Sequence, residues 1–133
     1  MSWISLLDNA EFLLSLYPDS VPSLEGAVLH EVKMHCEGPV VSLRFDVPDF
    51  PANPPAKWRT QRFNVAQVTV MGIGVRRLVQ NGWSNDTSVS ITFAAEDGGV
   101  RVRALGTGVE FEATFNHVRV DDVSAYLSSL KPT

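Results

Sequence analysis

The chain has 133 residues, of which 44% are hydrophobic and 20% are charged, a composition that predicts a single folded domain over residues 1–133. Its formal net charge of −4 argues against general nucleic-acid binding, which needs a concentrated basic face. Cys36 is the only cysteine, which excludes an intrachain disulfide and a four-cysteine metal site. The sequence shows no secretion signal and no apolar stretch of about twenty residues, so we expect a cytoplasmic protein without membrane contact.

The N-terminal segment predicts a short helix. Asp8 is placed to cap this helix, and Leu7 and Phe12 are spaced to form a hydrophobic staple around its first turn. Pro18 ends the helix because it removes a backbone donor. The residues from Trp3 to Leu7 favour a separate short helical turn before it.

The middle of the chain alternates apolar and polar residues with a period of two, which is typical of half-buried strands. In the first strand this period places Val28, Val32 and Met34 on one face. Toward the C-terminus the apolar phase flips at Val118, which predicts a bulge or turn near Asn116-His117. The predicted strands cover residues 28–36, 41–47, 63–71, 75–80, 89–93, 100–104 and 109–115.

The last segment has the spacing of a second helix. Asp121 or Asp122 is placed to cap it, and Tyr126, Leu127 and Leu130 recur on one face. Short connections between the strands favour antiparallel pairing. The sequence therefore predicts an α+β fold, with a twisted, mainly antiparallel sheet of about seven strands, an N-terminal helix and a C-terminal helix.

A proline-rich segment, Asp46–Val65, separates two of these strands and holds four of the eight prolines. Proline cannot donate to a strand ladder and fixes extended backbone, so we expect an ordered crossover that does not extend the sheet. Phe50 and Trp58 are expected to pack it onto the domain. Aromatic and arginine side chains also dominate protein interfaces, so Phe50, Trp58, Arg59 and Arg62 form a candidate partner-binding set.

The titratable residues do not form a catalytic or metal-binding pattern. His35 and Cys36 are neighbours on a strand and point to opposite faces, so they do not form a base–nucleophile pair. The glycines of "GIG" and "GTG" lie between strands and are interpreted as turns, because phosphate loops lead into a helix. We therefore expect no enzymatic activity, no metal and no cofactor.

Two further sets of residues have both a functional and an ordinary interpretation. Glu110 and Glu112 form an acidic strip that would suit a basic partner, or they belong to the solvent face of a sheet. The second set consists of aromatic residues that either line an apolar ligand cavity or pack in the core. These residues are Phe45, Phe93, Phe111 and Phe115.

Several short motifs, in order, resemble the immunity protein 50 family. Near the start these are Trp3, the helix that ends at Tyr17-Pro18, and the segment 21–24. The central motifs are "LHEV" at 29–32, "LRFDVPDFP" at 43–51 and "PPAKW" at 54–58. After Phe63 the similarity is looser and rests on Gln67-Val68 and Gly82-Trp83.

The resemblance covers most of the chain and implies a non-enzymatic immunity protein of a bacterial polymorphic toxin system. Such a protein binds a cognate toxin and blocks it in the producing cell. The family has no catalytic motif to transfer, in agreement with the expectation of no activity. The identity of the toxin, the interface and the oligomeric state stay open at this point.

Overall fold

The computed structural model describes residues 2–130, and within them the protein is mainly β. Its three helical segments are short: a 3-10 turn, η1 (Trp3–Leu6), and the helices α1 (Glu11–Leu16) and α2 (Ala56–Thr60). The strands are β1 (Glu25–His35), β2 (Val40–Val47), β3 (Val65–Asn81), β4 (Ser88–Glu96), β5 (Gly99–Leu105) and β6 (Glu110–Tyr126).

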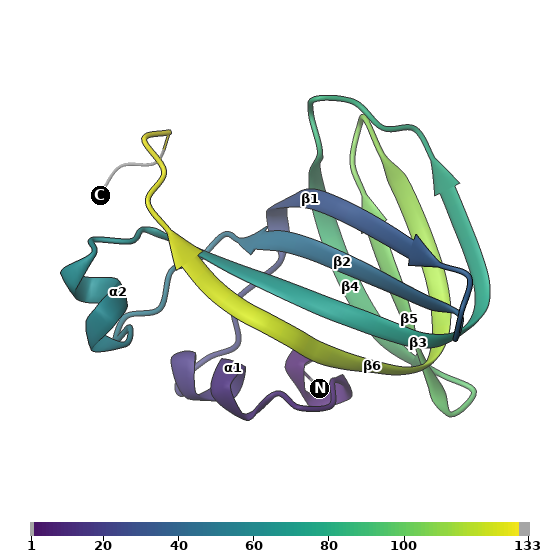
Figure 1. Cartoon of the computed structure of the whole chain (residues 1–133), viewed down its shortest axis with the longest axis horizontal. Coiled ribbons are helices and arrows are strands. Elements are labelled where there is room, and N and C mark those ends of the chain that lie inside the picture. Colours follow the sequence, from purple (N-terminus) through teal and green to yellow (C-terminus); the bar gives the residue numbers. More distant parts are fainter. Residues whose placement is uncertain (1, 131–133) are drawn as a thin grey trace.

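The six strands form one antiparallel sheet that closes on itself in the order β1-β2-β3-β6-β5-β4. In the view of Figure 1, β1, β2, β3 and β6 run across the front and β4 and β5 lie behind them. The closing contact joins β4 to the start of β1, from Glu25 to Val28. Figure 1 shows α1 and η1 below the front strands, and α2 at the end of the sheet where β3 begins.

Two long strands hold the sheet together, because β3 and β6 pair from Val65↔Tyr126 to Asn81↔Glu110. Gly72 of β3 permits close packing within this pair, because a Cβ there would lie 2.5 Å from the ring of Phe115. The ring therefore packs directly against the glycine backbone. The "GIG" segment lies inside the single strand β3, so its interpretation as a turn between two strands is wrong.

The prediction of about seven strands with a C-terminal helix is also wrong. The two strands expected at 63–71 and 75–80 form the single strand β3, and the expected helix is the end of β6. Asp122 pairs with Thr69, and Tyr126 pairs with Val65. The helical spacing of apolar residues is overridden here by pairing with a long neighbouring strand. The fold is accordingly mainly β, because no helix within residues 2–130 is longer than the six residues of α1.

The N-terminal helix and the turn before it are confirmed, but the capping is not as predicted. The N-cap of α1 is Ala10, which makes no side-chain cap hydrogen bond. Asp8 instead joins the sheet, since its backbone N–H donates to the Val118 carbonyl at 2.9 Å. Phe12 is 49% exposed and turns toward Trp58, so it forms no staple with the buried Leu7.

A bulge in β1 changes which side chains face inward. The register with β2 shifts between Leu29 and Glu31, so the strict alternation predicted for this strand does not hold. Ala27 and Leu29 are buried, whereas Met34 is 51% exposed. The prediction that Val28 and Met34 share one face is therefore wrong, since Val28 pairs with Asp46 and Met34 pairs with the buried Val41.

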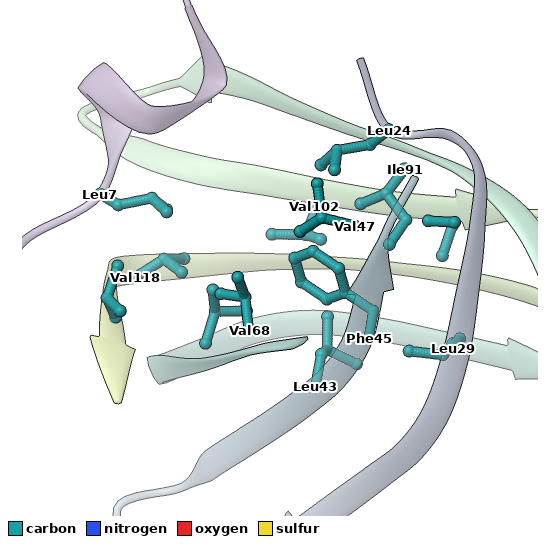
Figure 2. Packing of buried hydrophobic residues seen from close by; sticks show 14 of the residues in the cluster. Leu7, Leu24, Leu29, Leu43, Phe45, Val47, Val68, Ile91, Val102 and Val118 are labelled. Carbon is teal, nitrogen blue, oxygen red and sulfur yellow. The ribbon is translucent and has the colours of Figure 1, made fainter. Parts of the chain in front are cut away.

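The interior is filled by one hydrophobic core, to which every strand contributes. β2 supplies the most regular part, because alternate residues from Val41 to Val47 are buried, as its sequence predicts. Figure 2 shows Phe45 at the centre of this packing, among Leu43, Val68 and Val102. Phe111 and Phe115 are also fully buried, and Phe93 stacks on Trp3 at a centroid distance of 5.5 Å, so these rings take part in packing.

Candidate functional site

The proline-rich segment folds into an ordered crossover that carries the short helix α2. Pro55 precedes the helix with φ −54° and ψ 150°, the extended backbone that proline favours. The first helical hydrogen bond runs from the Arg59 N–H to the Pro55 carbonyl at 3.1 Å. The helix buries Trp58 to 8% exposure and leaves Lys57 and Arg59 exposed.

Trp58 holds α2 against the domain through aromatic contacts. Phe12 of α1 meets it edge-on, with centroids 6.3 Å apart and an interplanar angle of 89°. Phe50 packs on it in a tilted arrangement at 6.0 Å. These contacts confirm the packing role predicted for Phe50 and Trp58, and edge-to-face geometry of this kind stabilises beyond the area it buries. Phe12 was not in the candidate set.

The C-terminus of α2 is a Schellman motif with an arginine at the position where glycine is preferred. The Phe63 N–H donates to the Trp58 carbonyl at 3.0 Å, and the Arg62 N–H donates to the Arg59 carbonyl at 3.1 Å. Arg62 has φ 59°, in the left-handed region. A residue with a Cβ pays about 1 kcal/mol there. Arg62, whose side chain is exposed, therefore occupies a position at which its Cβ strains the backbone.

A hydrogen bond from α1 holds the start of the same segment. The Tyr17 hydroxyl donates to the Asp49 carbonyl at 2.6 Å. Burial, followed by the charge of Asp49, raises the pKa of Tyr17 above its ordinary value. Beside this bond lies an open groove of about 580 Å³, to whose lining Tyr17, Pro48 and Phe50 contribute. The proline-rich segment is therefore fixed to α1 at two points, Tyr17 and the aromatic contact of Phe12.

The Lys and Arg side chains of the described residues differ in whether a carboxylate lies near them. Six have a carboxylate within 4.0 Å: Lys33, Arg44, Arg77, Arg101, Arg103 and Arg119. Arg76 has none and donates to neutral oxygens, including Asn116 Oδ1 at 2.7 Å and the Asp97 carbonyl at 3.0 Å. Within residues 2–130 the remaining cations without a carboxylate, Lys57, Arg59 and Arg62, all belong to α2 or to its end, and Arg59 donates to the Pro54 carbonyl at 3.1 Å. We call these three residues with Phe12 the α2 surface.

The predicted acidic strip lies on the outer face of β6, away from α2, and one of its members is neutralised. Glu112 Oε2 accepts from Arg103 at 2.6 Å, and its other oxygen lies 3.5 Å from Arg77 Nη1. The hydrogen bond from Arg103, opposed by partial desolvation, holds the pKa of Glu112 below its ordinary value. Glu110 is exposed at the start of the strand. The structure thus brings Arg59 and Arg62 together but places Glu112 in an internal ion-pair cluster.

A polar network that the sequence did not predict crosses the outer face of the front strands. Asp46 accepts a hydrogen bond from Tyr126, lies 2.8 Å from His30 Nε2 and accepts from Gln67 Nε2 at 2.9 Å. Arg44 extends the network by donating to Gln67 Oε1 at 3.2 Å. Burial and the bond to Asp46 raise the pKa of Tyr126 to about 12. The four side chains around Asp46 come from four different strands, so the register of the sheet determines this network.

Other kinds of site find no support in the described part of the chain. Among residues 2–130, no cluster of three or more His, Cys, Asp or Glu side chains has a geometry for a metal ion. In the same residues no helix is long and apolar enough to cross a membrane.

Comparison with known proteins gives one finding. The model of the family described as Immunity protein 50 matches residues 9–126, which include both α1 and α2 and all six strands. No curated protein and no solved structure matches the chain.

Proposed function

The chain belongs to the immunity protein 50 family, and from this membership we propose that it binds and neutralises the cognate toxin of a bacterial polymorphic toxin system. The match over residues 9–126 is the observation that carries the proposal. Immunity proteins of this kind are typically non-enzymatic. The proposed mechanism is stoichiometric binding in the cytoplasm of the producing cell, where the bound protein covers a surface that the toxin needs.

The α2 surface supports this mechanism because it has the composition of a protein interface. A stable interface buries about 800 Å² on each partner, and a few aromatic and arginine residues supply most of its binding energy. Arg59 and Arg62 are exposed beside aromatic residues, and Phe50 and Trp58 hold their segment in place. Because the backbone of this segment is ordered before the partner arrives, little backbone entropy is lost on binding.

Glu110 and Glu112 are a second proposed contact set, suited to a basic toxin. Their support is weaker, because a basic partner would have to compete with Arg103 for the Glu112 carboxylate. An ion pair that is open to solvent contributes little to stability, so this competition does not forbid the contact. Replacement of Glu110 alone by glutamine tests the set, because it leaves the pairs of Glu112 with Arg77 and Arg103 intact and should weaken binding if the strip contacts the toxin.

Co-expression tests the function itself. The toxin gene next to the gene of this chain is induced in a host cell, alone and together with this protein. We expect growth arrest with the toxin alone, growth when both are present, and a complex that co-purifies with equal amounts of the two proteins. An unrelated immunity protein is the control for rescue. If the cells still arrest and no complex forms, the proposed function is wrong.

A further inference from the structure

We infer that the α2 surface docks onto an acidic face of the toxin. The inference rests on the proposed function and names the chemistry of the partner at that site. In the docked complex, Lys57, Arg59 and Arg62 pair with carboxylates of the toxin, and Phe12 makes an aromatic contact between the two proteins.

The distribution of ion pairs carries the inference. The chain is acidic overall, with a formal net charge of −4, so its general field would attract a basic protein. The α2 surface departs from this average, because no carboxylate of the described residues lies within 4.0 Å of its three cations, whereas the six paired cations lie on the sheet. A toxin carboxylate can therefore pair with Arg59 or Arg62 without displacing an internal carboxylate, which is the condition for charge complementarity to favour binding.

The backbone at Arg62 is a second, independent observation. Three residues other than glycine have positive φ among the described residues: Asn9, Asp97 and Arg62. Asparagine and aspartate tolerate this region, but arginine gains nothing from it in folding, and glycine at the same position would avoid the strain. Strained backbone of this kind is concentrated at binding and active sites. A contact between the Arg62 side chain and the toxin, which the isolated protein lacks, would explain why an arginine occupies this position.

Phe12 adds an apolar contact beside the cations. Its ring is 49% exposed although it packs edge-on against the buried Trp58. Covering the exposed part of an aromatic ring removes apolar area from water, which favours binding. Phe12 thus contacts the helix that carries cations without a carboxylate partner, and an aromatic contact combined with charged residues is typical of an interface anchor with a polar rim. The contact therefore combines aromatic burial with charge pairing.

Two double variants that reverse charges test the inference. Each is made in the full chain, and its binding to an inactivated form of the cognate toxin is measured. The double variant Arg59→Glu/Arg62→Glu is compared with Lys33→Glu/Arg119→Glu, whose cations lie on the sheet. Each replacement subtracts two charges, so both variants change the formal net charge from −4 to −8. Calorimetry at about 50 mM and about 500 mM NaCl measures the affinity and its dependence on salt.

We expect the α2 variant to bind at least about tenfold more weakly than wild type at low salt, and its affinity to depend less on salt. The sheet variant should bind within about threefold of wild type. Equal losses in the two variants would mean that only net charge matters and would overturn the inference. Wild-type affinity in the α2 variant would overturn it while leaving the proposed function intact. Absence of wild-type binding would overturn both.

Arg62→Gly separates binding from folding. Glycine suits the left-handed position, so this variant should unfold at a urea concentration equal to or above that of wild type. It should nevertheless bind the toxin several-fold more weakly, because one of the three cations is lost. A stable variant that keeps full affinity would exclude Arg62 from the contact and overturn its part of the inference.

Discussion

At the scale of single residues, the two tyrosines fix the start of the proline-rich segment from opposite sides. Tyr17 donates to the carbonyl of Asp49, and Tyr126 donates to the carboxylate of Asp46. One bond comes from the end of α1 and the other from the end of β6. The beginning of the crossover is thus tied to both ends of the described chain, which positions the segment that carries α2.

Burial and polar neighbours predict that both tyrosines have a raised pKa in the folded protein. Burial and the Asp46 bond raise the pKa of Tyr126 to about 12 from the ordinary value of 10.0, and burial raises that of Tyr17 as well. The neutral phenol is favoured by folding, so the stability that it contributes is complete below pH 10.0 and is lost as the pH rises through about 12. The chain has only two tyrosines, so the variant Tyr17→Phe isolates Tyr126.

Titration of phenolate absorbance measures this directly. In Tyr17→Phe we expect a midpoint near 12 in buffer and near 10.0 in concentrated urea. Adding Asp46→Asn should lower the first midpoint but not restore the ordinary value, because burial is the larger cause. A midpoint near 10.0 in the folded single variant would mean that Tyr126 is neither buried nor bonded to Asp46 in solution.

Gly72 gives a prediction about packing between the two long strands. A Cβ at this position would lie 2.5 Å from the Phe115 ring, so Gly72→Ala forces the ring out of its place. Overpacking of this kind costs about 1–3 kcal/mol of unfolding free energy, measured by urea denaturation. The Gly72→Ala replacement should lower the unfolding free energy less in a Phe115→Leu background than in the wild-type protein, because the smaller leucine leaves room for the added methyl group. Equal costs in the two backgrounds would show that Phe115 does not limit the site.

At the scale of elements, the sequence predicts correctly those strands and turns whose structure is determined by residues close together in the chain. The alternation of β2 and the hairpin between β4 and β5 follow from period-two burial and from the Asp97-Gly98 turn. The C-terminal helix fails because Val123 and Tyr126 suit both a helix and a strand, and the choice is made by β3, which lies far away in sequence. β3 continues through the "GIG" segment, whose two glycines make it look like two strands in the sequence. α2 is too short for a periodic signal, at five residues.

The candidate site divides in the same way. The aromatic and arginine residues of the proline-rich segment stand out by type, so Trp58, Arg59 and Arg62 could be named from the sequence. The pairing of Phe12 with Trp58 needs the position of α1 on the fold, although Phe12 lies next to the buried Leu13 and thus off the inward stripe of the helix. Which cations lack a carboxylate depends on the register of every strand. The left-handed backbone of Arg62 has no sequence signal, because arginine seldom adopts it.

Trp58 gives the prediction at this scale, since it joins α2 to α1. Trp58 is 8% exposed and belongs to the core, so Trp58→Ala should lower the unfolding free energy by about 3 kcal/mol in urea denaturation. Trp83→Ala is the matched control, because Trp83 is 51% exposed, and we expect a change below about 1 kcal/mol. If the two substitutions cost the same, α2 is not held by its tryptophan. A stable Trp58→Ala that loses the toxin would make this residue a direct anchor.

At the scale of the whole molecule, the arrangement favours a single cooperative unit. One hydrophobic core contains residues of η1, α1, α2 and all six strands. β3 pairs with β2 in the front of the sheet, and β6 pairs with β5 in the back. The front and back strands therefore stay joined on this side as long as β3 and β6 remain paired. We therefore propose that the chain unfolds as one domain and that α2 is released only with the sheet.

The three tryptophans allow this to be tested, because they report on different parts of the molecule. Trp3 stacks on Phe93 near β4, Trp58 lies on α2, and Trp83 is exposed after β3. The variant Trp3→Phe/Trp83→Phe reports on α2 alone, and Trp58→Phe/Trp83→Phe reports on the region of β4. In each variant, urea transitions followed by fluorescence and by far-ultraviolet circular dichroism should coincide, as two-state unfolding requires. An α2 signal that changes at lower urea than the circular dichroism of the same protein would make α2 a separately released element. The docking surface would then not be preformed in the free protein, and the toxin would have to order it on binding.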